Sequence, residues 1–149
     1  MSLGEKIRHY LPFLRRYARA LTGSTRQGDA IVRMTLETIV AAPDEFEGPH
    51  ATRVLLYRYF HRILESVYLP DLVFEEDDDG LAREAQSRLS RTTPLGRQIL
   101  LLNTLEGFSL SETSVIVDLD RREVADMLRE AISEVDREAR TSVLIIEDE

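Results

Sequence analysis

The chain has no cysteine and no tryptophan among its 149 residues. Without cysteine it cannot form a disulfide, use a thiol nucleophile or build a cysteine-based zinc site, and such a composition suits a reducing cytoplasm. No apolar run approaches the roughly 18–20 residues that a membrane-spanning helix needs. Residues 1–10 also lack the apolar core of a signal peptide. We therefore expect a cytoplasmic protein that does not contact a membrane.

Residue patterns that carry catalysis are missing as well. The sequence has no Gly-rich phosphate loop, no cofactor fingerprint and no nucleophile paired with a base. Its three histidines, His9, His50 and His61, are scattered and have no carboxylate at the spacing of metal ligands. The acidic run 75–79 lacks the alternating oxygen ligands of a calcium loop. We interpret it as a solvated linker, with mimicry of nucleic-acid charge or docking of a basic partner as the alternative. We expect no enzymatic activity, metal or cofactor in this chain.

Charge is segregated along the sequence. Residues 1–70 have ten basic and seven acidic side chains, whereas residues 71–80 have six acids and no base. Residues 110–140 have nine acids and five bases, in a chain with a net charge of −8. Because nucleic-acid binding favours a basic surface, the acidic C-terminal half argues against contact with DNA.

Hydrophobic periodicity predicts helices throughout the chain. The expected helices are 3–22, 25–41, 49–68, 81–90, 94–106, 109–117 and 120–140. Pro43 and Gly48-Pro49 separate the second helix from the third, and Pro70 ends the third. Ser109 and Asp120 are expected N-caps, and Glu112 completes a capping box with Ser109. The predicted fold class is all-α.

Residues 106–135 have the outline of a DNA-reading helix-turn-helix motif. Apolar side chains recur with the spacing of two short helices packed across a tight turn, at Leu110, Ile116, Leu119, Val124, Leu128 and Ile132. Ser114 is small, as needed where the two helices cross. In a DNA reader the second helix enters the major groove and its basic residues neutralise phosphates. Residues 120–130 instead contain four acids and three arginines, which gives this face the wrong charge.

Several positions of this motif match one known pattern without a gap, namely Glu106, Gly107, Ser109, Glu112, Val124, Leu128 and Ala131. In this register the motif resembles region four of extracytoplasmic-function sigma factors. Asp118 stands at that family's turn glycine, and Glu123 stands at the threonine that opens its recognition helix. Asp126-Met127 replaces its Ser-Arg pair. The resemblance implies a sigma-factor scaffold whose DNA-reading surface is lost.

The N-terminal third contains two further blocks, residues 10–23 and 28–36. With these blocks it resembles region two of the same sigma factors. Of the acidic face that the family presents to RNA polymerase, only Asp29 remains. Leu55 and His61-Arg62 stand where a tryptophan and an Arg-Asn pair help to melt the promoter. The resemblance implies that the polymerase surface and the DNA surface are lost together.

The last nine residues, 141–149, are an apolar run that ends in acids. They resemble the first strand of a receiver domain, a buried apolar strand that ends in an acidic pair helping to hold Mg²⁺. By this resemblance Glu147 and Asp148 are that pair, and Mg²⁺ is expected only in a complete receiver domain. We therefore expect an orphan first strand at 142–147, without neighbouring strands in this chain.

Two sigma-like lobes joined to a receiver-like tail are similar to the PhyR-type anti-anti-sigma response regulators. The resemblance implies an all-α, two-lobed sigma-factor-like architecture with a C-terminal helix-turn-helix, plus the orphan first strand of a receiver domain. Its parts are a region-two-like lobe at 1–70, an acidic linker at 71–80, a region-four-like lobe at 81–140 and the start of a receiver domain at 141–149.

The same resemblance implies a function by competition. Phosphorylation of the receiver would release the lobes to bind and sequester a NepR-type anti-sigma factor, which frees the stress sigma factor. The receiver would be an intramolecular partner, and no contact with DNA is expected. The expected contact residues are Leu14, Tyr17, Val117 and Met127, with a polar rim of Arg121, Arg122, Glu123 and Asp126. For Leu14 and Tyr17, burial in the core is the alternative interpretation.

Two other functions stay open at this point. One is a genuine extracytoplasmic-function sigma factor that binds core RNA polymerase and promoter DNA, and the other is an unrelated helical receptor or adaptor. Promoter-specific initiation with core polymerase would distinguish the sigma factor from the mimic.

Overall fold

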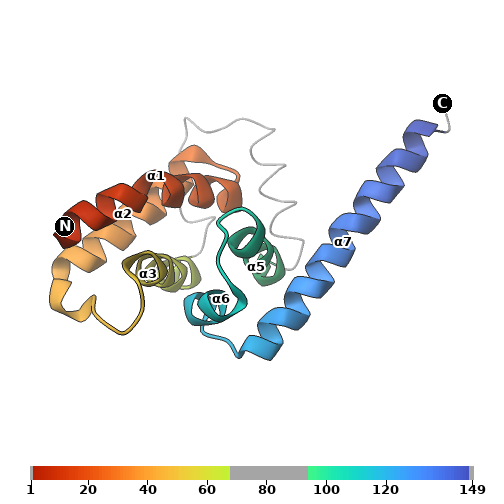
Figure 1. The fold of residues 1–149 in the computed structure, drawn as a ribbon. Helices are drawn as coiled ribbons and strands as arrows, with labels where there is room; N and C mark the ends of the chain where they lie inside the picture. Colours follow the sequence, from red (N-terminus) through yellow and green to blue (C-terminus); the bar gives the residue numbers. More distant parts are fainter. Residues whose placement is uncertain (1, 68–93, 148–149) are drawn as a thin grey trace.

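The computed structural model describes residues 2–67 and 94–147, and every regular element within these ranges is helical. We call α1 (Leu3–Thr22), α2 (Thr25–Ala41), the short 3₁₀ helix η1 (Pro43–Glu45) and α3 (Thr52–Ser66) the first lobe. We call α5 (Pro94–Thr104), α6 (Leu110–Val117) and α7 (Arg121–Glu147) the second lobe. Figure 1 shows α7 extending away from the other helices. The predicted all-helical fold is confirmed, while the predicted helix 81–90 and the acidic linker 71–80 lie outside the described residues.

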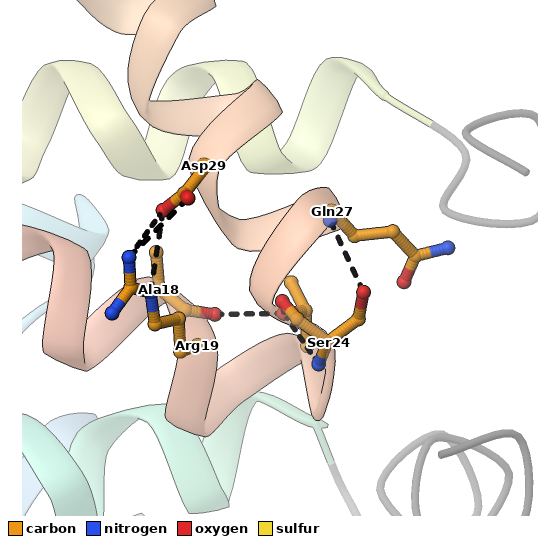
Figure 2. Close-up of polar contacts among 6 residues, drawn as sticks. Ala18, Arg19, Ser24, Gln27 and Asp29 are labelled. Carbon is orange, nitrogen blue, oxygen red and sulfur yellow. Dashed lines mark hydrogen bonds and ion pairs between the residues drawn. The ribbon is translucent and has the colours of Figure 1, made fainter. Parts of the chain in front are cut away.

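Local signals fix the ends of the first two helices. The Ser2 hydroxyl accepts a hydrogen bond from a first-turn backbone amide and caps α1. Gly23 ends α1 in the left-handed conformation, with φ of 69°, which glycine adopts without steric cost. Ser24 then caps α2 by accepting from the Gln27 backbone amide at 3.2 Å (Figure 2). The predicted boundaries 3–22 and 25–41 are confirmed.

The third helix is shorter than the predicted range 49–68. Gly48 precedes Pro49, and a residue before proline avoids the helical backbone conformation. α3 begins at Thr52, after Ala51 in an extended conformation, and ends at Ser66. Pro43 begins η1, a position that suits its fixed φ. Phe46, just after η1, is buried and anchors this connection to the core.

A compact turn joins α5 to α6. α5 ends at Thr104, two residues before its predicted end, and Gly107 then has a φ of 74°. The Phe108 backbone amide donates to the Leu102 oxygen at 3.0 Å, and the Asn103 side chain donates to the Phe108 oxygen at 3.0 Å. These hydrogen bonds attach the turn to the last residues of α5, so the connection between α5 and α6 is short and well ordered.

The predicted caps of the helix-turn-helix are present. The Ser109 hydroxyl accepts from the Glu112 amide at 3.1 Å, and the Glu112 carboxylate accepts from the Ser109 amide at 2.9 Å. This reciprocal arrangement is a capping box. At the start of α7, the Asp120 carboxylate accepts from the Arg122 amide at 3.4 Å. Both helices therefore begin where the sequence pattern places them, within one residue.

The last helix overturns the predicted strand at 142–147. α7 is helical as far as Glu147, which also extends the predicted helix 120–140. A lone strand has no neighbour to satisfy its backbone amides and carbonyls, whereas a helix satisfies them within itself. In the structure the apolar run continues the preceding helix.

One hydrophobic core extends through both lobes. The largest fully buried side chains include Tyr17, Tyr57, Phe60, Phe108, Leu14, Ile31, Leu56, Ile99, Leu102 and Ile116. Ile132, predicted to pack between the last two helices, is instead 49% exposed, and Figure 1 shows the C-terminal part of α7 extending away from the other helices. Within the described residues, no helix combines the length and apolar character needed to cross a membrane.

Candidate partner interface

The turn between α6 and α7 keeps the geometry of a helix-turn-helix without its glycine. Asp118 has φ of 56° and ψ of 48°, a left-handed conformation in which aspartate is tolerated better than most residues. The Ser114 hydroxyl donates to the Leu119 oxygen at 2.8 Å, and the Leu119 amide donates to the Ser114 oxygen at 3.1 Å. The small Ser114 therefore ties the two sides of the turn together.

The outer face of α7, directly after this turn, carries mixed charge. Its predicted rim residues Arg121, Arg122, Glu123 and Asp126 are all exposed. The Asp126 carboxylate also pairs with the Arg129 guanidinium at 3.5 Å, and both side chains are exposed. Such a pair is weak, but it places a carboxylate beside the cation that a phosphate would need. The face therefore suits a protein partner with mixed charge better than a nucleic acid.

The two apolar candidates on the second lobe differ in accessibility. Met127 is partly exposed and packs against the core, so it can contribute to a contact surface. Val117 is buried at the end of α6, beneath the turn. Met127 is therefore available as an apolar anchor in this conformation, and Val117 supports the surface from below.

Leu14 and Tyr17 are core residues rather than surface contacts. Both side chains are fully buried. The Tyr17 hydroxyl lies 2.7 Å from the His61 Nε2 atom, and its ring packs against those of Tyr57 and Phe60. The face of α1 that we expected to meet a partner is the face that α3 covers. The structure therefore supports the alternative interpretation, burial in the core, and a contact of these two residues with a partner stays a prediction.

Some residues stand at positions that correspond to the promoter-melting and polymerase surfaces of sigma factors. Their side chains make contacts inside the first lobe. Leu55 and His61 are buried in α3. Asp29 pairs with Arg19, whose guanidinium lies 3.2 Å from the carboxylate, and this pair joins α2 to α1 (Figure 2). These side chains therefore serve the packing and pairing of helices within the lobe.

A buried carboxylate joins the two lobes. The Glu106 side chain, which lies just after α5, is 0% exposed, and its Oε2 atom lies 3.2 Å from Arg16 of α1 and 3.7 Å from Arg53 of α3. The Arg53 guanidinium also donates to the Glu106 backbone oxygen. A buried carboxylate is costly unless it is paired, so this site commits three helices to one arrangement. The sequence pattern marked Glu106 only as a matching position of the motif.

Aromatic packing surrounds this ion-pair site. The Arg53 guanidinium lies 4.0 Å from the centre of the Phe108 ring, which is close enough for a cation–π contact. Phe108 meets Tyr57 edge to face, with ring centres 4.9 Å apart. We call Arg16, Arg53, Tyr57, Glu106 and Phe108 the lobe junction. It combines directional charge pairs with apolar burial across the boundary between lobes.

Burial determines the ionisation state of three groups in or next to the lobe junction, namely Tyr17, Tyr57 and His61. It raises the pKa of Tyr17 well above its usual value of 10, and the neighbouring Tyr57 and Glu106 add to the rise. It raises the pKa of Tyr57 as well, with Glu106 adding to the shift and Arg53 opposing it. Burial lowers the pKa of His61 from 6.5 to about 4. All three groups are thus neutral near pH 7, which fits a structural role.

The described residues offer no ready-made metal site, since no group of three or more His, Asp or Glu side chains within 2–67 and 94–147 is placed to hold an ion. The two polar features of these ranges that bear on contacts between proteins or lobes are the mixed-charge face of α7 and the lobe junction. Both are suited to protein–protein or lobe–lobe contact.

Comparison with known proteins identifies the family. A model of the sigma2 domain of PhyR matches residues 7–61, and a model of the sigma-like domain of the response regulator PhyR matches residues 89–138. The chain also aligns with the solved PhyRSL–NepR complex from Sphingomonas sp. Fr1 at 45% identity and a TM-score of 0.73, covering 92% of this chain and 88% of that one. The chain belongs to the PhyR family.

Two further relatives agree with this assignment to the PhyR family. The phyllosphere-induced regulator PhyR of Methylorubrum extorquens is 42% identical over 149 residues, which are 100% of this chain and 55% of that protein. The chain thus spans about half the length of this curated relative. The co-crystal structure of PhyR with the anti-sigma factor NepR from Bartonella quintana matches with 32% identity and a TM-score of 0.72, covering 92% of this chain and 50% of that one. The resemblance predicted from the sequence is confirmed.

Proposed function

We propose that this chain is a sigma-factor mimic that binds and sequesters a NepR-type anti-sigma factor. The observation that carries the proposal is the match to the PhyRSL–NepR complex over 88% of that chain, because the relative was solved with an anti-sigma factor bound. The relative from Bartonella quintana was likewise crystallised with NepR. Sequestering the inhibitor frees the stress sigma factor, and the mimic acts by binding in the cytoplasm, without catalysis.

Competition explains why the scaffold is kept while the charges differ from those of a DNA reader. A mimic needs the surface that the inhibitor recognises, but it gains nothing from surfaces that bind promoter DNA or polymerase. The mixed-charge face of α7 and the buried positions of α3 meet both conditions. Receiver phosphorylation, as the family resemblance implies, would control when this surface is available.

The proposed contact surface comprises the accessible residues of α7. Met127 serves as an apolar anchor, and Arg121, Arg122, Glu123 and Asp126 form the polar rim around it. An amphipathic helix of the anti-sigma factor would lie across this face in a helix-in-groove mode. Buried apolar anchors dominate affinity, whereas rim charges mainly alter association rate and salt dependence.

Calorimetric titration with a NepR-type protein tests this surface. We expect Met127→Ala to weaken binding by about 1–2 kcal/mol because it removes a central apolar contact. Arg122→Glu should slow association and change its salt dependence. Arg140→Glu is the matched control, since Arg140 lies far along the same helix and pairs with Asp136 at 3.2 Å.

The outcomes separate the contact surface from the function. Circular dichroism first confirms that each variant keeps its helical content. If Met127→Asp and Arg122→Glu both bind like the wild type, the contact surface lies elsewhere, although the mimic hypothesis survives. If the wild-type chain does not bind at micromolar concentration, the proposed function fails.

A further inference from the structure

We propose that Glu106 is a positioning residue that fixes the angle between the two lobes, and so sets the direction in which α7 presents the proposed contact surface. The inference rests on the proposed function for its biological meaning, but its physical basis is the lobe junction. Glu106 touches no expected contact residue of α7, and it acts through the arrangement of helices.

The geometry of the junction resists both translation and rotation. The Glu106 Oε2 atom pairs with Arg16 of α1 and Arg53 of α3. Two different helices of the first lobe therefore contact one atom of the second lobe. Arg53 also donates to the Glu106 backbone oxygen and stacks on Phe108 two residues later. A segment held at a side chain, a carbonyl and a ring has a defined orientation.

The chain on either side of Glu106 carries this orientation into the second lobe. The Glu106 amide donates to the Leu101 oxygen at 3.0 Å, which ties it to the last turns of α5. Phe108 is tied back to Leu102, and Ser109 begins the capping box of α6. Because α5 and α6 both pack on α7, fixing Glu106 fixes the direction of the helix that carries the proposed contact face.

Charge adds something here that apolar packing cannot supply. Burial of Phe108 against Tyr57 is non-directional, and the edge-to-face preference of the two rings is weak, so this contact tolerates small rotations of one lobe on the other. Charge-assisted hydrogen bonds are directional, and a buried carboxylate without its partners is strongly disfavoured. The two arginines therefore select one angle from those that the apolar contact allows.

The absence of cysteine from the chain makes a direct measurement possible. Spin labels on Val40→Cys in α2 and Ser111→Cys in α6 report one inter-lobe distance by pulsed electron paramagnetic resonance. Val40 is 77% exposed and Ser111 is also exposed, so neither label disturbs the core. We expect a single narrow distribution for the otherwise unchanged chain.

The Glu106→Gln variant keeps the shape of the side chain and removes its charge. We expect it to broaden the distance distribution or add a second population, while the helical content stays the same. Asp29→Asn is the matched control, because it breaks an Arg–Asp pair of 3.2 Å within the first lobe. That control should leave the inter-lobe distance unchanged.

The Arg16→Gln variant tests the same ion pair in case Glu106→Gln does not fold. The Arg16 side chain is 51% exposed, so its replacement leaves no buried charge of its own, and Arg53 still pairs with Glu106. We expect a smaller broadening than in Glu106→Gln. If Glu106→Gln loses helical content, Arg16→Gln decides alone. An unchanged distribution in the folded variants, with only a lower melting temperature, overturns the proposal.

Titration with a NepR-type protein gives the second readout. If Glu106→Gln reduces the aligned fraction to about one tenth, the apparent Kd rises about tenfold, because only the aligned molecules bind. A broadened distribution with unchanged Kd overturns the link to the partner. If the wild-type chain itself does not bind, the proposed function fails, while the distance measurement still decides the role of Glu106.

Discussion

His61 shows how a single buried residue can be held neutral at the centre of the first lobe. Its Nε2 atom lies 2.7 Å from the Tyr17 hydroxyl, and its ring packs against that of Phe60. Burial lowers its pKa to about 4, and the Gln98 side chain of α5 partly offsets the effect of burial. A histidine that aligned with a promoter-melting position is thus part of the aromatic core.

This neutral histidine predicts a loss of stability in mild acid. The unfolded chain takes up a proton on His61 near pH 6.5, but the folded chain does so only near pH 4. Stability from His61 is therefore complete above about pH 6.5 and is lost as the pH falls towards 4. The difference corresponds to roughly 3 kcal/mol. Denaturant unfolding at about pH 7 and about pH 4.5 measures it.

The matched variant is His61→Gln, which can still hydrogen-bond to Tyr17 but does not titrate. Carboxylates elsewhere in the chain also titrate in this range, so the prediction concerns the difference between the wild type and His61→Gln. The wild type should lose more stability than His61→Gln between the two pH values. Equal losses would show that His61 is protonated without penalty in the folded state.

The roles of individual residues were hardest to predict where their partners are distant in sequence. Glu106 pairs with Arg16 and Arg53 across separations of 90 and 53 residues, and no local pattern encodes such pairs. The burial of Leu14 and Tyr17 was hard to predict for a related reason. Periodicity shows that they share a helix face, but it does not show whether another helix or a partner covers that face.

At the scale of elements, local chemistry was a good guide. Helices begin or end through contacts within a few residues, as at Gly23, Ser24 and the Ser109–Glu112 capping box. The boundaries of α1 and α2 could therefore be predicted from the sequence. The apolar run 142–147 was different, because its choice between strand and helix depends on neighbouring strands. In the structure this run is part of α7.

The crossing of α1 and α2 depends on a glycine, and Gly28→Ala should disrupt it. A Cβ atom on Gly28 would lie 3.0 Å from the Ala18 carbonyl carbon and 3.0 Å from the Arg19 nitrogen, which are backbone atoms that cannot swing aside. Overpacking of this kind costs about 1–3 kcal/mol. It outweighs the gain of up to about 1 kcal/mol that alanine brings to a helix. Thermal denaturation should show a lower midpoint.

Gly4→Ala is the control for this substitution. Gly4 lies in α1, and a Cβ atom there meets nothing within 4 Å. The same chemical change should therefore leave the midpoint unchanged or raise it slightly. If Gly28→Ala were as stable as Gly4→Ala, close approach of the two helices would not be the reason for the glycine.

At the scale of the whole molecule, the distribution of charge sets what the surface can attract. The chain has a net charge of −8, and its helix-turn-helix lobe presents carboxylates beside its arginines. Affinity for DNA comes largely from neutralising phosphates and releasing their counterions. Carboxylates on the same face oppose both effects.

We therefore expect negligible binding of this chain to duplex DNA near physiological salt. Fluorescence polarisation with labelled promoter duplexes measures it, and a Glu123→Lys/Asp126→Arg double variant provides a comparison in which two repulsive groups become attractive. The variant should gain weak, salt-sensitive binding. Micromolar, sequence-dependent binding by the wild type would instead favour a working sigma factor over a mimic.

The length of α7 gives the molecule a mechanical property. At 27 residues and 1.5 Å per residue, the helix is about 40 Å long. The last 16 residues, beyond Ala131, form an arm of about 24 Å. A tilt of about 10° at the base of this arm displaces Glu147 by about 4 Å, which is comparable to one turn of helix. α7 therefore acts as a lever, and a small tilt at the base of this arm becomes a larger movement at its far end.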